Sequence, residues 1–277
     1  MPVEASNTLR VISAHACSFF SPGDALQKIL FADLDDTLFH SYRKHHPGPG
    51  WLVAATLRDG SAFSYTSPRQ RAAFELWQSV LTIIPVTARN HDSFRRVTLA
   101  FHAEAILDYG AVVLDSDGAP DPDWLARSAS LAREHDATLQ SWFDKLCQHC
   151  EEQEAGLRVR WIDDFGVRLY LVAKSTVGNV DAVSALAQTC RAARDAGQLP
   201  ADVTIHCNAN NLAILPRWLD KRHAVEYVQR RYTLDGEPPL SFGMGDSLVD
   251  LPFLAACDYQ IVPTHSQIGQ AIDRIER

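Results

Sequence analysis

The sequence predicts an α/β protein: a parallel-sheet core interrupted by an inserted α+β domain. Two observations lead to this prediction. Three short apolar runs, each separated from the next by helical patterns, resemble the buried strands of a parallel sheet: "KILFA", "VLTIIPV" and "PLSFGMG". The middle of the chain instead alternates between helices and hairpins, which is typical of an antiparallel sheet packed against helices.

Each apolar run of the predicted core ends at a polar residue. The first run stops at Asp33, the second at Thr87 and the third at Asp246. Open α/β sheets bind ligands at the carboxyl ends of their strands, so we expect these three side chains to converge on one site. Core helices are predicted over 68–79, with a proline in the first turn, and over 223–231.

The middle of the chain has its own succession of elements. Residues 123–154 are mostly helical in pattern, and 157–174 read as a hairpin around an Asp-Phe-Gly turn. Residues 178–197 have helical spacing and a glycine stop, and 202–216 again read as strand, turn and strand.

These elements define the expected domains. We expect an α+β cap domain, an antiparallel sheet plus helices, at 118–216, and a core formed by 1–117 and 217–277. A further hairpin at about 51–67 follows the aspartate-rich turn, where it would overhang the strand ends as a flap.

Composition and charge argue against several classes of protein. The chain is 46% hydrophobic and 22% charged, which is typical of a globular protein, and its net charge of −8 without a basic stripe argues against nucleic acid as a partner. No window reaches the roughly 18 apolar residues of a membrane span, and residues 1–20 lack a leader pattern. The six cysteines are scattered, so we expect reduced thiols and a cytoplasmic protein. The sequence does not indicate the oligomeric state.

Two pairs of aspartates point to a metal ion. Asp33 and Asp35 are two apart on an extended segment, so their side chains point the same way. Asp246 and Asp250 are four apart, which makes them neighbours on one face if a helix starts there. Like charges this close repel unless a proton or a cation lies between them. Because the ligands are hard oxygens without clustered histidines or cysteines, Mg²⁺ is favoured over Zn²⁺ or Ca²⁺.

Four segments together resemble the motifs of the haloacid-dehalogenase-like phosphatases. "DLDDTLF" resembles the first motif and "IIPVTARN" the second, whereas "LPRWLDKRHAV" resembles the third, a lysine near a helix start, and "GMGDSLVD" the fourth. They occur in the family's order and frame a Rossmann-like core of roughly 160 residues, so the set is far more specific than any one motif. The insert is similar to the type 2 caps of this superfamily, and most similar to those of the sugar-phosphate phosphatases, such as sucrose-phosphate phosphatases.

The resemblance implies a mechanism and a set of site residues. Asp33 would attack phosphorus, and Asp35 would act first as general acid and then as general base. Thr87 and Lys221 would hold the phosphoryl oxygens. The implied Mg²⁺ ligands are Asp33, Asp35 through its carbonyl, Asp246 and Asp250.

Further residues are predicted to bind the substrate. Backbone N–H groups around Leu34 and Asp36, and Ala88 directly after Thr87, would cradle the phosphate. In the cap, polar residues in or beside the hairpin turns would contact the leaving group if those turns overhang the core, although ordinary turn chemistry explains each of them equally well: Arg168, Asn208 and Asn210.

Two positions depart from the family pattern. Asp36 stands where the first motif usually has glycine, a mild departure because Asp tolerates unusual backbone angles. "DKRHAV" stands where related chains often carry Lys-Gly, so Lys174 is an alternative to Lys221 as the lysine of the site.

Three other motifs have weaker functional interpretations. "GDSL" at 245–248 matches the opening block of the GDSL esterases, but no Asp-x-x-His follows it, and a serine without its base is inert. Cys147 and Cys150 have zinc-site spacing, although a helix face is the commoner explanation. "LDSDGAPD" resembles a calcium loop but has Ala126 at the position of the bidentate glutamate, so a turn is favoured.

The sequence therefore predicts a Mg²⁺-dependent phosphomonoester hydrolase that acts through an aspartyl phosphate on a small phosphorylated metabolite. A sugar or polyol phosphate is expected from the cap resemblance alone. Two alternatives stay open: a phosphotransferase or phosphomutase with the same nucleophile, and a non-catalytic protein that binds a phosphometabolite.

Overall fold

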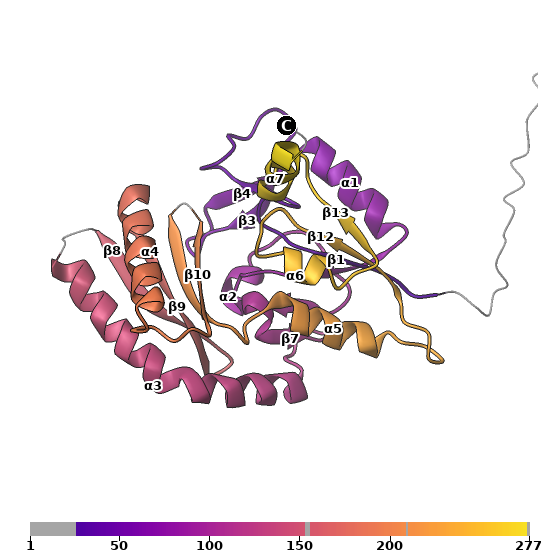
Figure 1. The fold of residues 1–277 in the computed structure, drawn as a ribbon. Coiled ribbons are helices and arrows are strands. Elements are labelled where there is room, and N and C mark those ends of the chain that lie inside the picture. Colours follow the sequence, from indigo (N-terminus) through magenta and orange to yellow (C-terminus); the bar gives the residue numbers. More distant parts are fainter. Residues whose placement is uncertain (1–25, 153–155, 209, 276–277) are drawn as a thin grey trace, which may run out of the picture.

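A parallel four-stranded sheet forms the core of the protein. The computed structural model describes residues 26–152, 156–208 and 210–275, shown in Figure 1. The strands lie in the order β13-β12-β1-β5, and all pairs are parallel. Their bounds are β1 (Lys28–Ala32), β5 (Thr82–Pro85), β12 (Leu240–Met244) and β13 (Tyr259–Ile261). The three polar-terminated runs of the sequence are therefore adjacent strands, as the fold class required.

Helices cover both faces of this sheet. Ile29 and Phe31 of β1 belong to the same buried cluster as α5 (Lys221–Arg231), whereas Leu30 and Ala32 belong to the cluster that contains Phe74 of α1 (Pro68–Gln78). Because successive strand residues point to opposite faces, α1 and α5 lie on opposite sides of β1 (Figure 1). The core continues with α2 (His91–Phe94), β6 (Ala105–Leu107), η1 (Asp108–Gly110), β7 (Val112–Leu114), α6 (Leu251–Leu254) and α7 (Gln267–Ile275).

A small antiparallel sheet follows the aspartate-rich turn. It has the order β2-β4-β3, with β2 (His40–Ser41), β3 (Leu52–Thr56) and β4 (Ala62–Thr66). The chain leaves this flap into α1 through Ser67, whose hydroxyl accepts the N–H of Gln70, while the Gln70 side chain accepts the N–H of Ser67. This reciprocal capping box fixes the helix start.

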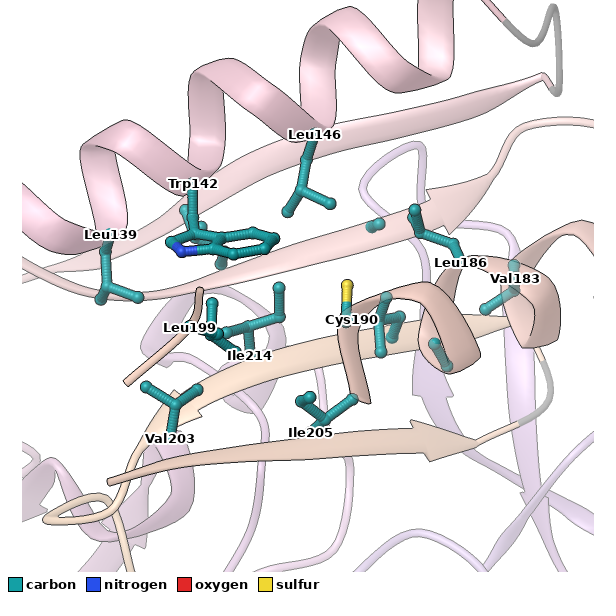
Figure 2. Close-up of a cluster of buried hydrophobic side chains, with 14 of the residues drawn as sticks. Leu139, Trp142, Leu146, Val183, Leu186, Cys190, Leu199, Val203, Ile205 and Ile214 are labelled. Carbon is teal, nitrogen blue, oxygen red and sulfur yellow. The ribbon is translucent and has the colours of Figure 1, made fainter. Parts of the chain in front are cut away.

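The inserted segment forms an antiparallel sheet with two long helices. The order is β10-β11-β9-β8, with β8 (Leu157–Asp164), β9 (Val167–Ser175), β10 (Val203–Asn208) and β11 (Asn211–Pro216). Helices α3 (Pro122–Glu152) and α4 (Val180–Asp195) pack on one face of it. Figure 2 shows that packing, in which Trp142 and Leu146 of α3 and Cys190 of α4 face Ile205 and Ile214 of the sheet. The opposite face of the sheet turns toward the core.

Helix α3 belongs to both parts of the molecule. Near its start, the Trp124 Nε1–H donates to the Gly110 carbonyl at 2.9 Å, and the Ser128 hydroxyl donates to the Ala111 carbonyl at 2.7 Å. Further along, Trp142 is buried against the cap sheet. One 31-residue helix thus ties the cap to the core. The domain limits at 118 and 216 stay predictions.

Among the described residues, no helix combines the length and apolarity that a bilayer crossing requires. The expectation about a leader concerns residues 1–20, which lie outside the described residues.

Candidate active site

Three carboxylates and one ammonium group meet at the carboxyl ends of β1 and β12. Oxygens of Asp33, Asp246 and Asp250 lie within 4.8 Å of one another. The Lys221 ammonium donates to Asp33 Oδ1 at 2.6 Å and to Asp250 Oδ1 at 2.7 Å. Lys221 is only 4% exposed. A buried lysine therefore joins the two acidic motifs, which are far apart in the sequence.

The local backbone explains why Lys221 reaches this position. It is the first residue of α5, and the Asp220 side chain caps the helix by accepting the N–H of Arg222 at 2.9 Å. The Asp220 backbone lies against Gly110, where a Cβ would come within 2.7 Å of the Asp220 carbonyl oxygen. Gly110 also has φ +95°, a conformation that favours glycine. The close approach sets the start of α5 beside the strand ends.

The cluster carries more negative charge than its lysine balances. Burial and the nearby Asp250 carboxylate raise the pKa of Asp246 to about 7. Burial raises the pKa of Asp33 as well, against the lowering effect of Lys221. Despite burial, the pKa of Lys221 is raised by Asp250 and Asp33, so this lysine stays protonated. Grouped hard oxygens with excess negative charge suit a divalent cation such as Mg²⁺.

Asp246 and Asp250 approach each other through a turn, and no helix starts at Asp246. Residues 246–250 form bends and turns, and α6 begins only at Leu251. Both Asp250 oxygens are occupied, Oδ1 by Lys221 and Oδ2 by the N–H and the hydroxyl of Ser247, at 3.0 and 2.8 Å. Among the described residues, no donor contacts the Asp246 carboxylate. Asp246 is therefore the more available ligand, and Asp250 is the residue that orients Lys221.

Arg89 is a site residue that the sequence argument missed. Its Nε–H and Nη2–H donate to the two oxygens of Asp35 at 2.7 and 2.8 Å. The Asp35 carboxylate is turned toward Arg89, and it lies outside the carboxylate group formed by the other three aspartates. Arg89 lies two residues after Thr87, inside the segment "IIPVTARN", so its position in the sequence could have indicated that it belongs to the site. Its partner, however, is 54 residues away in the sequence.

Thr87 and the amides of Leu34 and Ala88 follow the ends of β5 and β1, which are paired strands. Thr87 is 1% exposed, and its hydroxyl accepts the N–H of Arg89 at 3.1 Å. Among the described residues, the N–H groups of Leu34 and Ala88 donate to no backbone carbonyl. The N–H of Asp36, by contrast, donates to the Phe39 carbonyl at 2.8 Å. That amide is engaged in the turn, which corrects its expected role in holding phosphate.

Asp36 has a different place in the site from the one expected. Its φ of +67° is the left-handed conformation that glycine favours, which explains glycine at this position in the resembling family. Its side chain accepts from Lys44 and contacts His40 Nδ1 at 3.4 Å. Lys44 also donates to Asn208 Oδ1 of the cap at 3.5 Å. Lys44 thus bridges the turn of the first motif to the cap.

A cavity of about 820 Å³ lies between the core, the flap and the cap. Asp35, Asp36, Ala88 and Arg89 line it from the core. The cap contributes residues from all four of its strands and the turns beside them, including Arg160, Tyr170, Lys174, Asn208, Asn210 and Asn211. The volume is within the range of small-molecule sites, so a ligand larger than phosphate fits.

Arg168 does not reach this cavity. Its guanidinium donates to Gln140 Oε1 of α3 at 3.0 Å and lies 5.0 Å over the Trp161 ring. The β8–β9 pairing is irregular between Ile162 and Asp163, which shifts the facing of the residues beyond it. The predicted contact of Arg168 with a leaving group is therefore not supported by its position.

The alternative lysine and the other motifs lie in different surroundings. Lys174 lines the cavity from β9 and is not part of the acidic cluster. Cys150 is buried among the apolar residues of the cap, on the helix face that the sequence favoured. Asp115 accepts the N–H groups of Asp117 and Ala119, which makes the calcium-like segment a turn.

The comparisons with known proteins identify the fold. No protein-family model and no curated protein matches the sequence. The C-terminal domain of Candida albicans trehalose-6-phosphate phosphatase has a TM-score of 0.57 at 14% identity, over 91% of this chain and 78% of its own. The sucrose-phosphatase of Synechocystis sp. PCC6803, solved with sucrose and phosphate, has a TM-score of 0.51 at 14% identity, over 91% and 97%. The chain therefore has the fold of the haloacid-dehalogenase-like phosphatases, a parallel core sheet with an inserted α+β cap.

Proposed function

We propose that the protein is a Mg²⁺-dependent phosphomonoester hydrolase that works through an aspartyl phosphate on a small phosphorylated metabolite. One observation carries the proposal: buried Lys221 joins Asp33 to Asp250, beside Asp246, at the carboxyl ends of adjacent parallel strands. A protein that only bound a phosphometabolite would need neither a nucleophile nor an acid two residues away from it.

The chemistry follows from the two aspartates of the first motif. A carboxylate oxygen of Asp33 attacks phosphorus, and the bond to the leaving oxygen breaks as Asp35 gives that oxygen a proton. Water then attacks the phosphorus of the aspartyl phosphate, Asp35 takes its proton, and the bond to Asp33 breaks. The Asp35 carboxylate is 46% exposed, so it can be reached by both a leaving group and water.

The surrounding residues neutralise the transferred group. Lys221 supplies a fixed positive charge, and the Thr87 hydroxyl and the N–H groups of Leu34 and Ala88, which have no backbone acceptor among the described residues, supply donors for the phosphoryl oxygens. Mg²⁺ would be held by Asp33 and Asp246, with the Asp35 carbonyl and Asp250 nearby, and when bound it would neutralise charge on the phosphoryl oxygens. Asp250 holds Lys221 in place through its own hydrogen bond.

A sugar or polyol phosphate is the substrate class we infer. The two solved structures named above are phosphatases of trehalose 6-phosphate and of sucrose phosphate by name. The cap side of the cavity carries asparagine side chains that suit hydroxyl groups, among them Asn208 and Asn211. A phosphotransferase would share the first half-reaction, but the exposure of Asp35 to solvent favours water as the acceptor.

The test is phosphate release from a panel of sugar phosphates and a chromogenic phosphomonoester, with Mg²⁺ and with chelator. We expect metal-dependent release from the wild type and a loss of more than a thousandfold in Asp33→Asn, because the amide is no nucleophile. Asp144→Asn, on an exposed part of α3, is the matched control. Release that survives Asp33→Asn would exclude the aspartyl phosphate. Transfer to added alcohols in preference to water would identify a phosphotransferase instead.

A further inference from the structure

Three cations line the cavity without an acidic partner. Lys44 and Arg89 also line it, but they pair with Asp36 and Asp35 of the core. The three others make no ion pair and no side-chain hydrogen bond with any of the described residues: Arg43, Arg160 and Lys174. The chain as a whole has a net charge of −8, so this excess of unpaired positive charge is local to the cleft.

The strand pattern of the cap explains why two of these cations face the cleft. Tyr170, Val172 and Lys174 alternate along β9 and line the cavity, whereas Leu171 and Ala173 between them pack beneath α3 and α4. Arg160 of β8 pairs in register with Val172, so it is a diagonal neighbour of Lys174 on the same face. Asn211 of β11 pairs in register with Lys174 from the other side.

The third cation comes from the flap, on another side of the same cleft. Arg43 follows β2, and its guanidinium lies 5.7 Å from the centre of the Phe63 ring, which also lines the cavity. Partial desolvation in the cleft lowers the pKa of the Lys174 ammonium, and the nearby charges of Arg43 and Arg160 lower it further. Three like charges from three strands or loops repel one another unless an anion joins them.

We propose that the substrate carries a second anionic group on its leaving portion, a carboxylate or a second phosphate, bound by Arg43, Arg160 and Lys174. The proposal rests on the proposed function and narrows its substrate class to phosphorylated sugar acids and sugar bisphosphates. The reacting phosphoryl group has its own cation on the core, Lys221, and Arg89 is paired with Asp35, so the cap and flap cations are left for a different group. The asparagines beside Lys174 suit the hydroxyls between the two anions.

Binding to Asp33→Asn protein tests this proposal without any need for turnover. The probes are pairs that differ by one anion: sorbitol 6-phosphate against 6-phosphogluconate, which are both open chains, and fructose 6-phosphate against fructose 1,6-bisphosphate. Titration calorimetry with Mg²⁺ present gives each Kd. Charge-assisted hydrogen bonds are worth about 1.5–3 kcal/mol, so we expect the second anion to tighten binding by about 10- to 100-fold in at least one pair. The two pairs also separate a carboxylate from a phosphate.

Variants of the cleft cations then assign the contact. Arg160→Gln and Lys174→Met should remove most of the difference in Kd between the two members of a pair. Lys174→Arg should restore part of this difference. Arg133→Gln, on the exposed side of α3, should leave the difference unchanged. The proposal is overturned if the two members of each pair bind with equal affinity, or if no probe binds. It is also overturned if the Arg160 and Lys174 variants lose the same amount of affinity for both members of a pair. Hydrolysis is tested by comparing phosphate release from the wild type and from Asp33→Asn, whereas this inference is tested by comparing the binding of two probes. Failure of the proposed function and failure of this inference therefore give different results.

Discussion

Arg89 holds Asp35 by two hydrogen bonds, at 2.7 and 2.8 Å, outside the group of three carboxylates. The arginine is itself fixed: Nη1 donates to the Ser93 carbonyl at 3.3 Å, and the guanidinium lies 5.2 Å over the Phe39 ring. This fork orients the carboxylate that we propose as the general acid. Substrate must displace or share the contact before Asp35 can give up a proton, which makes Arg89 a positioning residue for the proton transfer.

Replacement of Arg89 should therefore slow substrates with poor leaving groups most. We expect Arg89→Met to lower kcat by about 10²-fold for a sugar phosphate, which is the rate contribution typical of a well-positioned general acid. The loss should be smaller for a nitrophenyl phosphate, because its leaving oxygen needs little protonation. Arg89→Lys should recover little, because an ammonium cannot make the two-pronged contact. Steady-state kinetics on both substrates provides the check. An equal loss on both would show that Arg89 acts on binding or on structure instead.

Loss of Lys221 should destabilise the folded protein strongly. Lys221→Met would leave the buried carboxylates of Asp33 and Asp250 without their cation, and breaking a buried pair in this way typically costs about 3–5 kcal/mol. Mg²⁺ should restore part of the loss, since it supplies positive charge to the same oxygens. The control is Arg222→Gln, whose exposed pair with Glu226 is screened by solvent and contributes little to stability. Denaturant unfolding with Mg²⁺ and with chelator measures both, and a loss below that of the control variant would contradict the prediction.

Mg²⁺ should stabilise the wild-type protein through Asp246. A ligand at a hundred times its Kd raises the free energy of unfolding by about 2.7 kcal/mol when it binds only the folded state. Asp246→Asn should remove most of this gain, because Asp246 is the carboxylate of the cluster that no protein donor occupies in the described residues. Asp144→Asn should retain it. Thermal unfolding across a Mg²⁺ titration is the measurement, and an unchanged gain in Asp246→Asn would place the ion elsewhere.

The elements of this fold were largely predictable, because local signals coincide with buried faces. The strand predicted at "KILFA" is β1, with four consecutive buried residues, and the helix predicted at 68–79 is α1, whose start is fixed by Ser67 and Pro68. The fold class is confirmed by the parallel core sheet, the separate cap sheet and the solved structures that share them.

Contacts that depend on packing between distant segments were not predictable in the same way. The pair of Asp35 with Arg89 and the engagement of the Asp36 amide by Phe39 follow from the docking of a turn and a strand end. Arg168 points away from the cavity because an irregular strand pair changes which face a residue occupies, a shift that no periodicity reveals. Asp246 and Asp250 meet through a turn, although their spacing suggested a helix.

The contact between core and cap contains two neighbouring acidic residues, one of them fully buried, that the proposed chemistry does not use. Asp108 is fully buried, and its Oδ1 accepts the hydroxyl of Tyr170 of β9 at 3.4 Å. Its Oδ2 has no hydrogen-bond partner among the described residues, and its acidic neighbour is Asp164, the last residue of β8. Burial, with the neighbouring Asp164, raises the pKa of Asp108 well above its usual range.

This pair should make the stability of the protein fall as pH rises. Because the pKa of Asp108 is higher in the folded than in the unfolded state, the folded state binds more protons between those two values, and the free energy of unfolding decreases across that interval. Asp108→Asn is neutral at every pH, can donate to Asp164, accept from Tyr170, and tolerate the φ of +51°. We expect the variant to exceed the wild type by about 1–2 kcal/mol at pH 7.5, with the difference nearly gone at pH 4. Denaturant unfolding at both pH values, with Asp144→Asn as control, tests this, and a difference that is independent of pH would show that native Asp108 is not protonated.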